Sequence, residues 1–289
     1  MKNKTYETYD MSGKENSCIT FLYSTFVGRI FLRAFVKPAL SKFFGLFMDR
    51  GVSKRIIPSF IRNNNVCLKD YKKKEYTSFN DFFTREVKEG CRPISENTSE
   101  VIAPCDGKLT AYSITADSLF EIKNSVYSVG CLLQDKELAG EFIDGQCLIF
   151  RLMPEDYHRY CYIDNGKILS QKKIKGVLHT VRPIAYPRYN IYTQNAREYA
   201  VLQTENFGKI IQMEVGALFV GRIVNHLKED DFVRGEEKGM FEFGGSTIVM
   251  LFQKDKIKIE SVIYENTQQN KETIVKMGDS IGERFVGHH

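Results

Sequence analysis

The sequence lacks tryptophan altogether, so the bulk of its core must come from other aromatic residues. It contains 21 phenylalanines and 15 tyrosines, and 43% of all residues are hydrophobic. Such a composition supports a full hydrophobic core. A chain of 289 residues is long enough for one large domain or two small ones.

Paired cysteine motifs are missing as well. The seven cysteines are scattered, and none belongs to a Cys-x-x-Cys pair. An odd number without that spacing argues against a disulfide framework and favours reduced thiols in a cytoplasmic protein. The histidines and carboxylates also lack the spacing of a ligand motif, so no metal site is expected.

Several signatures of other functions are absent. The sequence has no internal repeat of about 20–50 residues, no glycine-rich phosphate loop, and no Gly-x-Ser-x-Gly turn of the α/β-hydrolase serine enzymes. Its net charge of +5 and pI of about 8.7 favour an anionic partner. Because zinc spacings, RNA-binding signatures and long Lys/Arg runs are absent, nucleic acid is not the expected partner.

No uncharged run is long enough to cross a membrane. The longest covers residues 16–28, whereas a spanning helix needs about 20 apolar residues. Residues 1–16 are polar and charged, so no signal peptide is expected.

Residues 17–49 combine apolar and basic positions at helical spacing. Two apolar rows and one basic row recur every four positions: Leu22, Phe26 and Ile30; Val27, Phe31 and Phe35; Arg29, Arg33 and Lys37. The pattern predicts helices that lie either at a membrane interface, with the basic row on anionic headgroups, or against a core with a solvated edge. We expect Pro38 to divide the stretch into two helices.

The predicted secondary structure changes from helix to strand at about residue 101. Before it, Ser78 is predicted to cap a short amphipathic helix over Phe79–Val87. After it come short β-like runs, the main ones being Val101–Ala103, Leu109–Ser113, Gln146–Leu152, Lys173–Leu178, Ile210–Val215, Leu218–Ile223, Thr247–Gln253 and Ile257–Tyr264. We therefore predict an α+β fold. N-terminal amphipathic helices form a membrane-associating region, 1–100, and a mainly antiparallel β-rich catalytic body covers 101–289.

A Gly-Gly-Ser-Thr segment near the C-terminus lies between two apolar stretches. Gly245 has no side chain, so its carbonyl is open to close approach by the hydroxyl of Ser246. This arrangement suits a serine that attacks its own backbone. A plain β-turn accounts for the same residues.

Two further residues have the chemistry of a site. His158 follows an apolar run within a polar and aromatic cluster, where an imidazole serves either as general acid or base or as a hydrogen-bonded structural group. Asp106 precedes a glycine at a strand end, which suits either a turn or a carboxylate of a site. Asp106, His158 and Ser246 together are the ingredients of a charge-relay triad, whose order along the chain is free.

Together these segments resemble the phosphatidylserine decarboxylases, in the bacterial branch with a Gly-Gly-Ser-Thr processing site. The resemblance extends over almost the whole chain, and the combination of motifs is highly specific. The matching segments are Phe79–Arg85, Arg92–Ile94, Asp106-Gly107, Asp156–Arg159, Val215–Ala217, Val220-Gly221, Lys238-Gly239 and Phe243–Thr247.

The resemblance implies a proenzyme that cuts itself between Gly245 and Ser246. The products would be a β chain, 1–245, and an α chain, 246–289, in which the former Ser246 is a covalent pyruvoyl cofactor. Its ketone would form a Schiff base with phosphatidylserine and accept electrons as carbon dioxide leaves, giving phosphatidylethanolamine. The implied partners are phosphatidylserine, the anionic cytoplasmic face of the cell membrane, the two chains of one precursor, and a second copy in a homodimer.

One residue departs from the family pattern. Three positions after His158, where family members often carry a second histidine, this chain has Cys161. A thiol is a poor substitute for an imidazole base. Either His158 acts alone, or His179, expected on a neighbouring strand, supplies the second imidazole. His226 is expected to be structural or on the surface.

Two other functions stay open at this stage. One is a pyruvoyl-dependent decarboxylase of a soluble amino acid, although such a substrate needs no apolar and basic surface like 17–49. The other is a non-enzymatic membrane-binding homologue. The joint presence of Asp106, His158 and Ser246 argues against it, whereas Cys161 leaves it open.

Overall fold

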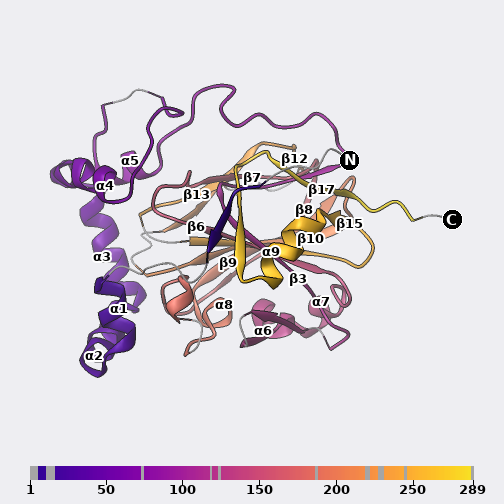
Figure 1. Cartoon of the computed structure of the whole chain (residues 1–289), viewed down its shortest axis with the longest axis horizontal. Coiled ribbons are helices and arrows are strands. Elements are labelled where there is room, and N and C mark those ends of the chain that lie inside the picture. Colours follow the sequence, from indigo (N-terminus) through magenta and orange to yellow (C-terminus); the bar gives the residue numbers. More distant parts are fainter. Residues whose placement is uncertain are drawn as a thin grey trace.

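The computed structural model describes residues 6–10, 17–72, 75–117, 119–122, 125–185, 188–218, 222–226, 231–243 and 246–287. Figure 1 shows a column of N-terminal helices beside a larger body built mainly from strands. The strands pair antiparallel in every sheet. This arrangement confirms the predicted α+β fold, with helices first and antiparallel sheets after them.

The helical column consists of short helices because its sequence is interrupted repeatedly. Its elements are α1 (Ser17–Ser24), α2 (Phe26–Phe35), α3 (Pro38–Met48), the 3₁₀ turn η1 (Gly51–Ile56), α4 (Ile57–Asn63) and, after a loop, α5 (Phe79–Phe83). The predicted break at Pro38 is confirmed. Proline is the first residue of α3, where its missing N–H leaves no bond unmade.

A second break, between α1 and α2, was not expected from the helical pattern. The Thr25 hydroxyl accepts a hydrogen bond from the Gly28 N–H at 2.9 Å, which caps a new helix. The chain bends by 101° there. A Cβ atom at Gly28 would lie 2.1 Å from the Phe21 carbonyl oxygen, so only glycine allows this contact.

Among the described helices, none is long and apolar enough to cross a membrane by itself. The bent pair α1–α2 meets that test only when its two arms are taken together.

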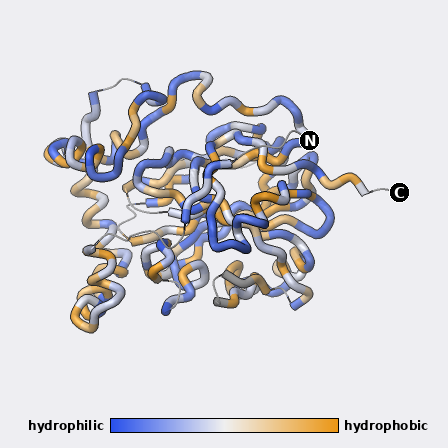
Figure 2. The backbone as a smooth tube through the Cα atoms, viewed as in Figure 1, coloured by the Kyte–Doolittle hydropathy of each residue, from blue (hydrophilic) through white to orange (hydrophobic). Residues whose placement is uncertain are grey.

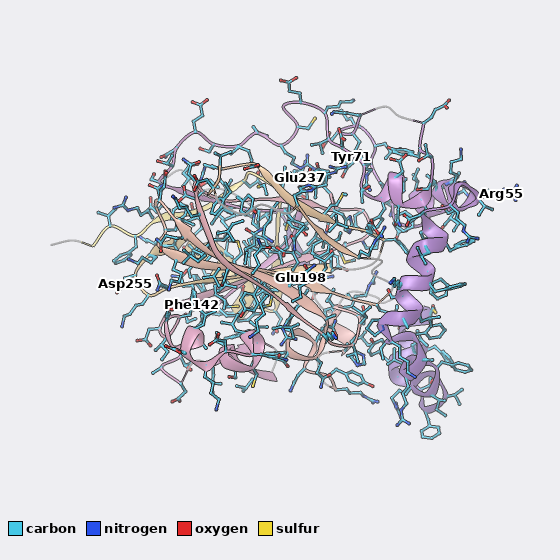
Figure 3. The ribbon with its side chains drawn as sticks, turned by 180° about the vertical axis from the view of Figure 1, so that it is seen from behind. Arg55, Tyr71, Phe142, Glu198, Glu237 and Asp255 are labelled. Carbon is cyan, nitrogen blue, oxygen red and sulfur yellow. The ribbon has the colours of Figure 1, made fainter. Side chains whose placement is uncertain are left out.

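The helical column has a buried side and an exposed side, so part of 17–49 packs against the core, whereas contact with a membrane stays a prediction. Its side chains buried in the core of the body are Leu22, Tyr23, Leu32 and Val36. Its exposed large apolar side chains are Phe21, Phe26, Val27, Ile30, Phe31, Phe43, Leu46 and Phe47. Orange runs along the column in Figure 2, and in Figure 3 its side chains project away from the body, with Arg55 at the outer tip.

The predicted apolar row of Leu22, Phe26 and Ile30 is wrong as one continuous face. Leu22 is 4% exposed, whereas Phe26 is 73% and Ile30 is 55% exposed. The bend at Thr25 separates them, because a helical row continues only along an unbroken helix.

The described residues contain a nine-stranded antiparallel sheet at the centre of the body. Its strands in spatial order are β1 (Thr8–Asp10), β16 (Lys271–Val275), β3 (Gly107–Ser113), β6 (Gln146–Leu152), β14 (Ser246–Phe252), β10 (Lys209–Gly216), β9 (Arg197–Thr204), β8 (Gly166–Ile174) and β12 (Asp231–Phe232). Strand β14 pairs with β6 on one side and β10 on the other along its whole length. The strand predicted over Gln146–Leu152 is confirmed as β6.

Smaller elements cover this sheet. They are the sheet β11 (Ile223–Asn225), β13 (Glu237–Phe241) and β7 (Arg159–Cys161); the sheet β15 (Ile257–Ile259), β17 (Ser280–Arg284) and β2 (Glu100–Ile102); the hairpin β4 (Leu119–Ile122) and β5 (Ser125–Ser128); and the helices α6 (Val129–Leu133), α7 (Lys136–Gly140), η2 (Pro183–Ala185), α8 (Ile191–Gln194) and α9 (Ser261–Gln268).

Two predicted strands are wrong in extent. The run Ile257–Tyr264 is a strand only to Ile259 and continues as helix α9, because a short apolar run fits either period. The run Lys173–Leu178 leaves the sheet after Ile174. There the chain passes so close to a neighbouring backbone that a Cβ on Gly176 would lie 2.3 Å from the Gln194 carbonyl oxygen.

The two faces of strand β14 contact different hydrophobic clusters. Val249 and Leu251 belong to the cluster that includes residues of α1 and α2, whereas Ile248 and Met250 belong to the cluster that includes residues of β7, β13 and α9. Side chains alternate along a strand, so Ser246 shares the face of Ile248 and Met250. Ser246 therefore points to the side covered by the small sheet β11–β13–β7.

A buried ion pair joins that small sheet to the central one. The Glu214 carboxylate on β10 is fully buried and lies 2.8 Å from the Lys238 ammonium on β13 through each oxygen. The Asn225 amide on β11 donates a further bond to it at 3.1 Å. Burial raises the pKa of Glu214, and Lys238 opposes that shift. The pair holds the two sheets in register beside Ser246.

We expect Lys238→Met to destabilise the protein by about 3–5 kcal/mol, because it leaves the Glu214 carboxylate buried without its counter-charge. Urea unfolding measures the change. The double variant Lys238→Met/Glu214→Leu should recover most of the loss, since no uncompensated charge remains. As control, Lys254→Ala removes a lysine from an exposed ion pair with Asp144 and should leave the midpoint unchanged. Equal midpoints for Lys238→Met and the control would contradict this role.

Candidate active site

Ser246 is the first residue of the central strand β14. Its backbone lies opposite Leu152 of β6 and Gly216 of β10. The side chain is fully buried, and its Oγ has no hydrogen-bond partner among the described residues. Gly244 and Gly245, which precede it, lie outside the described residues, as does the Val220-Gly221 motif. Gly216 has no side chain, and a Cβ atom there would lie 3.0 Å from the Leu178 side chain, so the chain is closely packed at this point of β10.

His158 lies on the small sheet that covers this face. It is fully buried, and its backbone carbonyl accepts a hydrogen bond from the Phe241 N–H at 2.9 Å. Ring atom Nδ1 lies 2.9 Å from the Asp156 carbonyl oxygen. A carbonyl only accepts, so Nδ1 carries the ring proton. The other nitrogen, Nε2, is then a free lone pair, and within the described part of the chain it has no partner.

The surroundings keep the His158 ring neutral. Burial, and after it the positive charge of Arg85, lower the pKa of His158 well below its usual range. A neutral imidazole with a free Nε2 is the form that accepts a proton from a nucleophile. The ring is therefore ready to act as a base at neutral pH.

Helix α5 and the residues after it hold the His158 loop. The Phe83 ring packs on the His158 ring with centroids 4.0 Å apart, and it also contacts Phe243 at 5.6 Å. Arg85 donates to the carbonyl oxygens of Glu155 at 2.9 Å and Asp156 at 3.1 Å. The predicted Ser78 cap of α5 is confirmed. Its support of His158 was missed, because the helical pattern shows only that the phenylalanines are buried.

Asn80 joins the helical column to the segment that leads into Ser246. Its side-chain oxygen accepts a hydrogen bond from the Phe243 N–H at 3.1 Å, and its side-chain nitrogen donates to Asp49 at 2.8 Å. Phe83 and Asn80 therefore connect His158, Phe243 and the end of α3. His158 and the segment that leads to Ser246 thus share the neighbour Phe83.

Asp106 is engaged elsewhere. Its carboxylate accepts two bonds from the Arg92 guanidinium, at 2.7 and 2.6 Å, and one from the Met277 N–H at 2.9 Å. No hydrogen bond joins Asp106 to His158 in the described ranges. Cys161 lies beside the turn that holds Asp106, since its N–H donates to the Pro104 carbonyl at 2.9 Å. The turn with Asp106 thus lies beside Cys161, the position at which family members often carry a second histidine. Burial raises the pKa of the Cys161 thiol to about 12.

His179 does not occupy the strand expected for it; it lies in a loop beyond the end of β8. Its ring is stacked on Tyr189 with centroids 4.0 Å apart, and its Nδ1 lies 3.2 Å from the Tyr23 hydroxyl. The link to the Ser246 region runs through Asn195, which bonds both the His179 and Gly216 carbonyls. His179 thus supports the backbone beside the site, and its imidazole contacts helix α1. His226 is partly exposed and bonds Glu237, as expected of a structural residue.

A cavity of about 240 Å³ opens next to these residues. Its lining includes Leu152, the strand partner of Ser246, together with Phe83, Phe243, Leu218 and Arg182. The walls are mainly apolar, with Arg182 supplying a basic group. The cavity can therefore hold a small amphipathic group beside Ser246.

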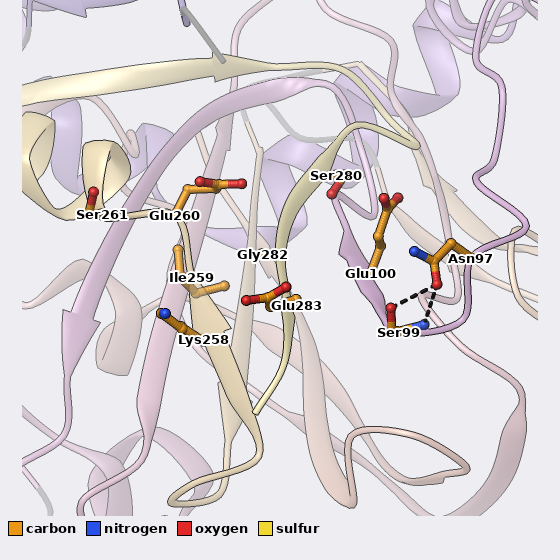
Figure 4. Close-up of a pocket in the computed structure, with 10 residues that line it drawn as sticks. All are labelled: Asn97, Ser99, Glu100, Lys258, Ile259, Glu260, Ser261, Ser280, Gly282 and Glu283. Atoms are coloured by element: carbon orange, nitrogen blue, oxygen red, sulfur yellow. Dashed lines mark hydrogen bonds between the residues drawn. The ribbon is translucent and has the colours of Figure 1, made fainter. Parts of the chain in front are cut away.

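A larger cavity, of about 510 Å³, lies around the sheet β15–β17–β2 (Figure 4). Glu100, Glu260 and Glu283 line it, and Ser99 donates two hydrogen bonds to the Asn97 side chain at its edge. It contains neither Ser246 nor His158. Among the described residues, no group of three or more histidines, cysteines or carboxylates is arranged to hold a metal ion.

The chain is similar to known proteins over most of its length. The model of the family "Phosphatidylserine decarboxylase" matches residues 79–283. "Phosphatidylserine decarboxylase proenzyme 2" of Clostridium acetobutylicum is 49% identical over 278 residues, covering 96% of this chain and 95% of the relative. "Phosphatidylserine decarboxylase proenzyme" of Clostridium perfringens is 39% identical over 289 residues, covering 98% of each.

The protein is therefore an enzyme of the carboxy-lyase class, a decarboxylase. Within that class, the chain belongs to the phosphatidylserine decarboxylase family.

The His158 tautomer is directly measurable. We expect ¹⁵N NMR at pH 7 to show His158 with a protonated Nδ1 and a bare Nε2, because the Asp156 carbonyl fixes the proton. The lowered pKa means that this neutral form persists as the pH falls through 6. His226, which is 46% exposed, serves as the internal comparison. Protonation of His158 with a midpoint near 6.5 would contradict the buried geometry.

Proposed function

We propose that this chain decarboxylates phosphatidylserine with a pyruvoyl group made from its own Ser246. The observation that carries the proposal is the state of the Ser246 hydroxyl, which is fully buried without a partner among the described residues. An unpaired buried hydroxyl costs roughly 1–3 kcal/mol of stability. A reaction at that atom gives a reason to retain it. The relatives' printed name, proenzyme, supports processing of the chain.

We assign the cleavage to the bond between Gly245 and Ser246. Ser246 Oγ attacks the Gly245 carbonyl carbon and gives its proton to Nε2 of His158. The proton passes to the Ser246 nitrogen as the C–N bond breaks, and an ester remains. His158 Nε2, neutral again, then takes the Cα proton of residue 246 as the Cβ–Oγ bond breaks, which leaves a carboxylate on Gly245 and a dehydroalanine on fragment 246–289. Water converts the dehydroalanine to pyruvoyl with release of ammonia.

His158 alone serves as the base in this scheme. Its Nε2 is unpaired, its ring is neutral, and it shares a face and the neighbour Phe83 with the chain around Ser246. Asp106 acts indirectly, because Arg92 and the Met277 N–H occupy its carboxylate. We therefore propose that Asp106 positions the turn at the start of β3.

The residues around Ser246 fit a pyruvoyl group. The buried Oγ without a partner among the described residues marks the atom from which it forms. Once present, its ketone supplies an electron sink for loss of carbon dioxide from an amino acid. His158 Nε2 is the group that would hold the proton delivered to the product. The apolar cavity lined by Leu152 and Phe243 would take the lipid part of the substrate.

We further propose that the helical column docks on the cytoplasmic face of the membrane. Its exposed apolar side chains include Phe26 at 73% and Phe43 at 68%. Ile19 of α1 and Phe60 of α4 line the cavity beside Ser246, so the column reaches from this surface to the site. A two-chain lipid substrate would then move from the bilayer to Ser246 along these helices.

The cleavage proposal is tested by intact-mass analysis of the purified protein. We expect two fragments, 1–245 and 246–289, the smaller one blocked at its N-terminus by pyruvoyl. His158→Gln should slow the cut by about 10²–10⁴-fold, the usual contribution of a general base. A single uncut wild-type chain would sink the proposal.

Control variants separate chemistry from folding. Ser246→Ala removes the nucleophile and should stay uncut while unfolding like the proenzyme. His226→Gln changes an exposed histidine and should be cut at the normal rate. If His158→Gln were cut as fast as His226→Gln, another residue would be the base.

Docking is tested with vesicles that contain phosphatidylserine. Phe26→Ser/Phe43→Ser should lower co-sedimentation by about tenfold or more per phenylalanine, since burying one such side chain stabilises binding by about 1.5–3 kcal/mol. Leu169→Ser/Val233→Ser is the matched control, because both residues are exposed apolar side chains of the body. Equal losses in the two double variants would disprove docking through the column.

A further inference from the structure

A third cavity, of about 490 Å³, lies between helix α2 and the loop that carries His179. Its walls include the basic side chains of Arg29 and Arg33 and the rings of His179 and Tyr189. None of these residues lines the cavity beside Ser246. The proposed reaction therefore leaves this cavity without a role.

The two arginines give the cavity positive charge. They lie four positions apart on α2, so one helical turn stacks their side chains on the same face. Neither forms an ion pair with a carboxylate in the ranges that the structure describes; the one hydrogen bond of Arg29 is to the Ser24 carbonyl, at 3.3 Å. Two uncompensated guanidinium groups on one wall favour an anionic ligand, and phosphate suits their planar donor geometry.

The Tyr23 hydroxyl fixes which nitrogen of His179 carries the proton. It accepts a hydrogen bond from the Thr180 N–H at 2.8 Å and lies 3.2 Å from His179 Nδ1. Among the described residues Nδ1 is the one acceptor for the proton of this hydroxyl, so Tyr23 donates to His179. His179 then carries its ring proton on Nε2, which has no partner in the described part of the chain. Burial lowers the pKa of His179 to about 4, so this neutral donor persists across physiological pH.

We propose that this cavity binds the phosphate of an anionic membrane phospholipid that is not the reacting lipid. Arg29 and Arg33 would pair with the phosphate oxygens, and His179 Nε2–H would donate a third bond. Phe26 and Ile30, 73% and 55% exposed, border the same cavity and suit the start of the acyl chains. The inference rests on the proposed docking of the helical column and gives that surface a defined headgroup site.

The test uses the full-length protein and vesicles of phosphatidylglycerol, which has a phosphate but no amine to react. Arg29→Ala/Arg33→Ala is compared with Lys42→Ala/Arg55→Ala, which removes two positive charges from α3 and η1, outside the cavity. General attraction to the vesicle falls equally in both. We expect the cavity variant to bind at least about tenfold more weakly than the control. Equal binding would overturn the proposal.

His179→Phe tests the site without changing charge. The phenyl ring keeps the stack on Tyr189 but has no donor, so binding to phosphatidylglycerol vesicles should fall about tenfold. His179→Gln returns an N–H near the position of Nε2 and should restore most of it. His179→Gln also keeps the test decisive if His179→Phe folds poorly. Wild-type binding by His179→Phe, or no recovery in His179→Gln, would disprove the role of His179.

Two further measurements separate the alternatives. Titration with glycerol 3-phosphate distinguishes a lipid ligand from a free phosphate. Saturable binding below about 1 mM that is lost in Arg29→Ala/Arg33→Ala would overturn the lipid assignment. The absence of saturable binding would support the lipid assignment. Intact mass and carbon dioxide release are followed on the wild-type protein. A chain that binds phosphatidylglycerol through the cavity but neither cuts itself nor decarboxylates would refute the proposed function alone.

Discussion

The pairing of strand β14 on both edges is the constraint on which the rest of the structure depends. Seven consecutive residues of β14 are matched to β6 on one side and to β10 on the other. This double pairing fixes where Ser246 lies and which face its hydroxyl meets. It also explains why the neighbouring strand β10 matters: its Glu214 pairs with Lys238 and so brings the small sheet, whose strand β7 begins just after His158, over the same face. A hydroxyl buried in this way cannot escape to solvent, so its reactivity is set by the few groups around it.

The helical column contacts the site with the side that packs on the body. Its opposite side carries exposed apolar side chains. Phe83 packs on His158, Arg85 binds the carbonyls of its loop, and Asn80 binds the chain just before the glycines. A region that looks in the sequence like a membrane-associating segment is therefore also part of the scaffold of the site. Burial removes competing water from His158 and lowers its pKa, while the Asp156 carbonyl selects its tautomer. Orientation of the base comes from a backbone carbonyl here.

The sequence predicted the fold class, the break at Pro38, strand β6 and the Ser78 cap, because each depends on local spacing or on one residue's backbone preference. It did not predict the bend at Thr25, which depends on a side-chain cap and a close contact across Gly28. The extents of β8 and β15 were wrong for a related reason, since short apolar runs fit both periods. Of the site residues, Ser246 and His158 are both fully buried, and their roles stay predictions. Asp106 pairs with Arg92, and His179 with Tyr23; these choices of partner depend on tertiary contacts that no spacing in the chain reveals.

The central position of β14 has a consequence for the proposed two-chain enzyme. Fragment 246–289 would contribute β14 and β16 to the nine-stranded sheet and β15 and β17 to a smaller one; β14, β16 and β17 pair with strands of fragment 1–245. The two fragments therefore share their sheets, and neither would refold by itself once they are separated. The sheet would therefore assemble only from the uncut chain. The peptide bond between Gly245 and Ser246 is needed for folding and is no longer needed once the sheet has formed. Cleaved enzyme that unfolds would not refold. Its lifetime would then depend on the rate at which β14 leaves the sheet, and not on the equilibrium between folded and unfolded protein.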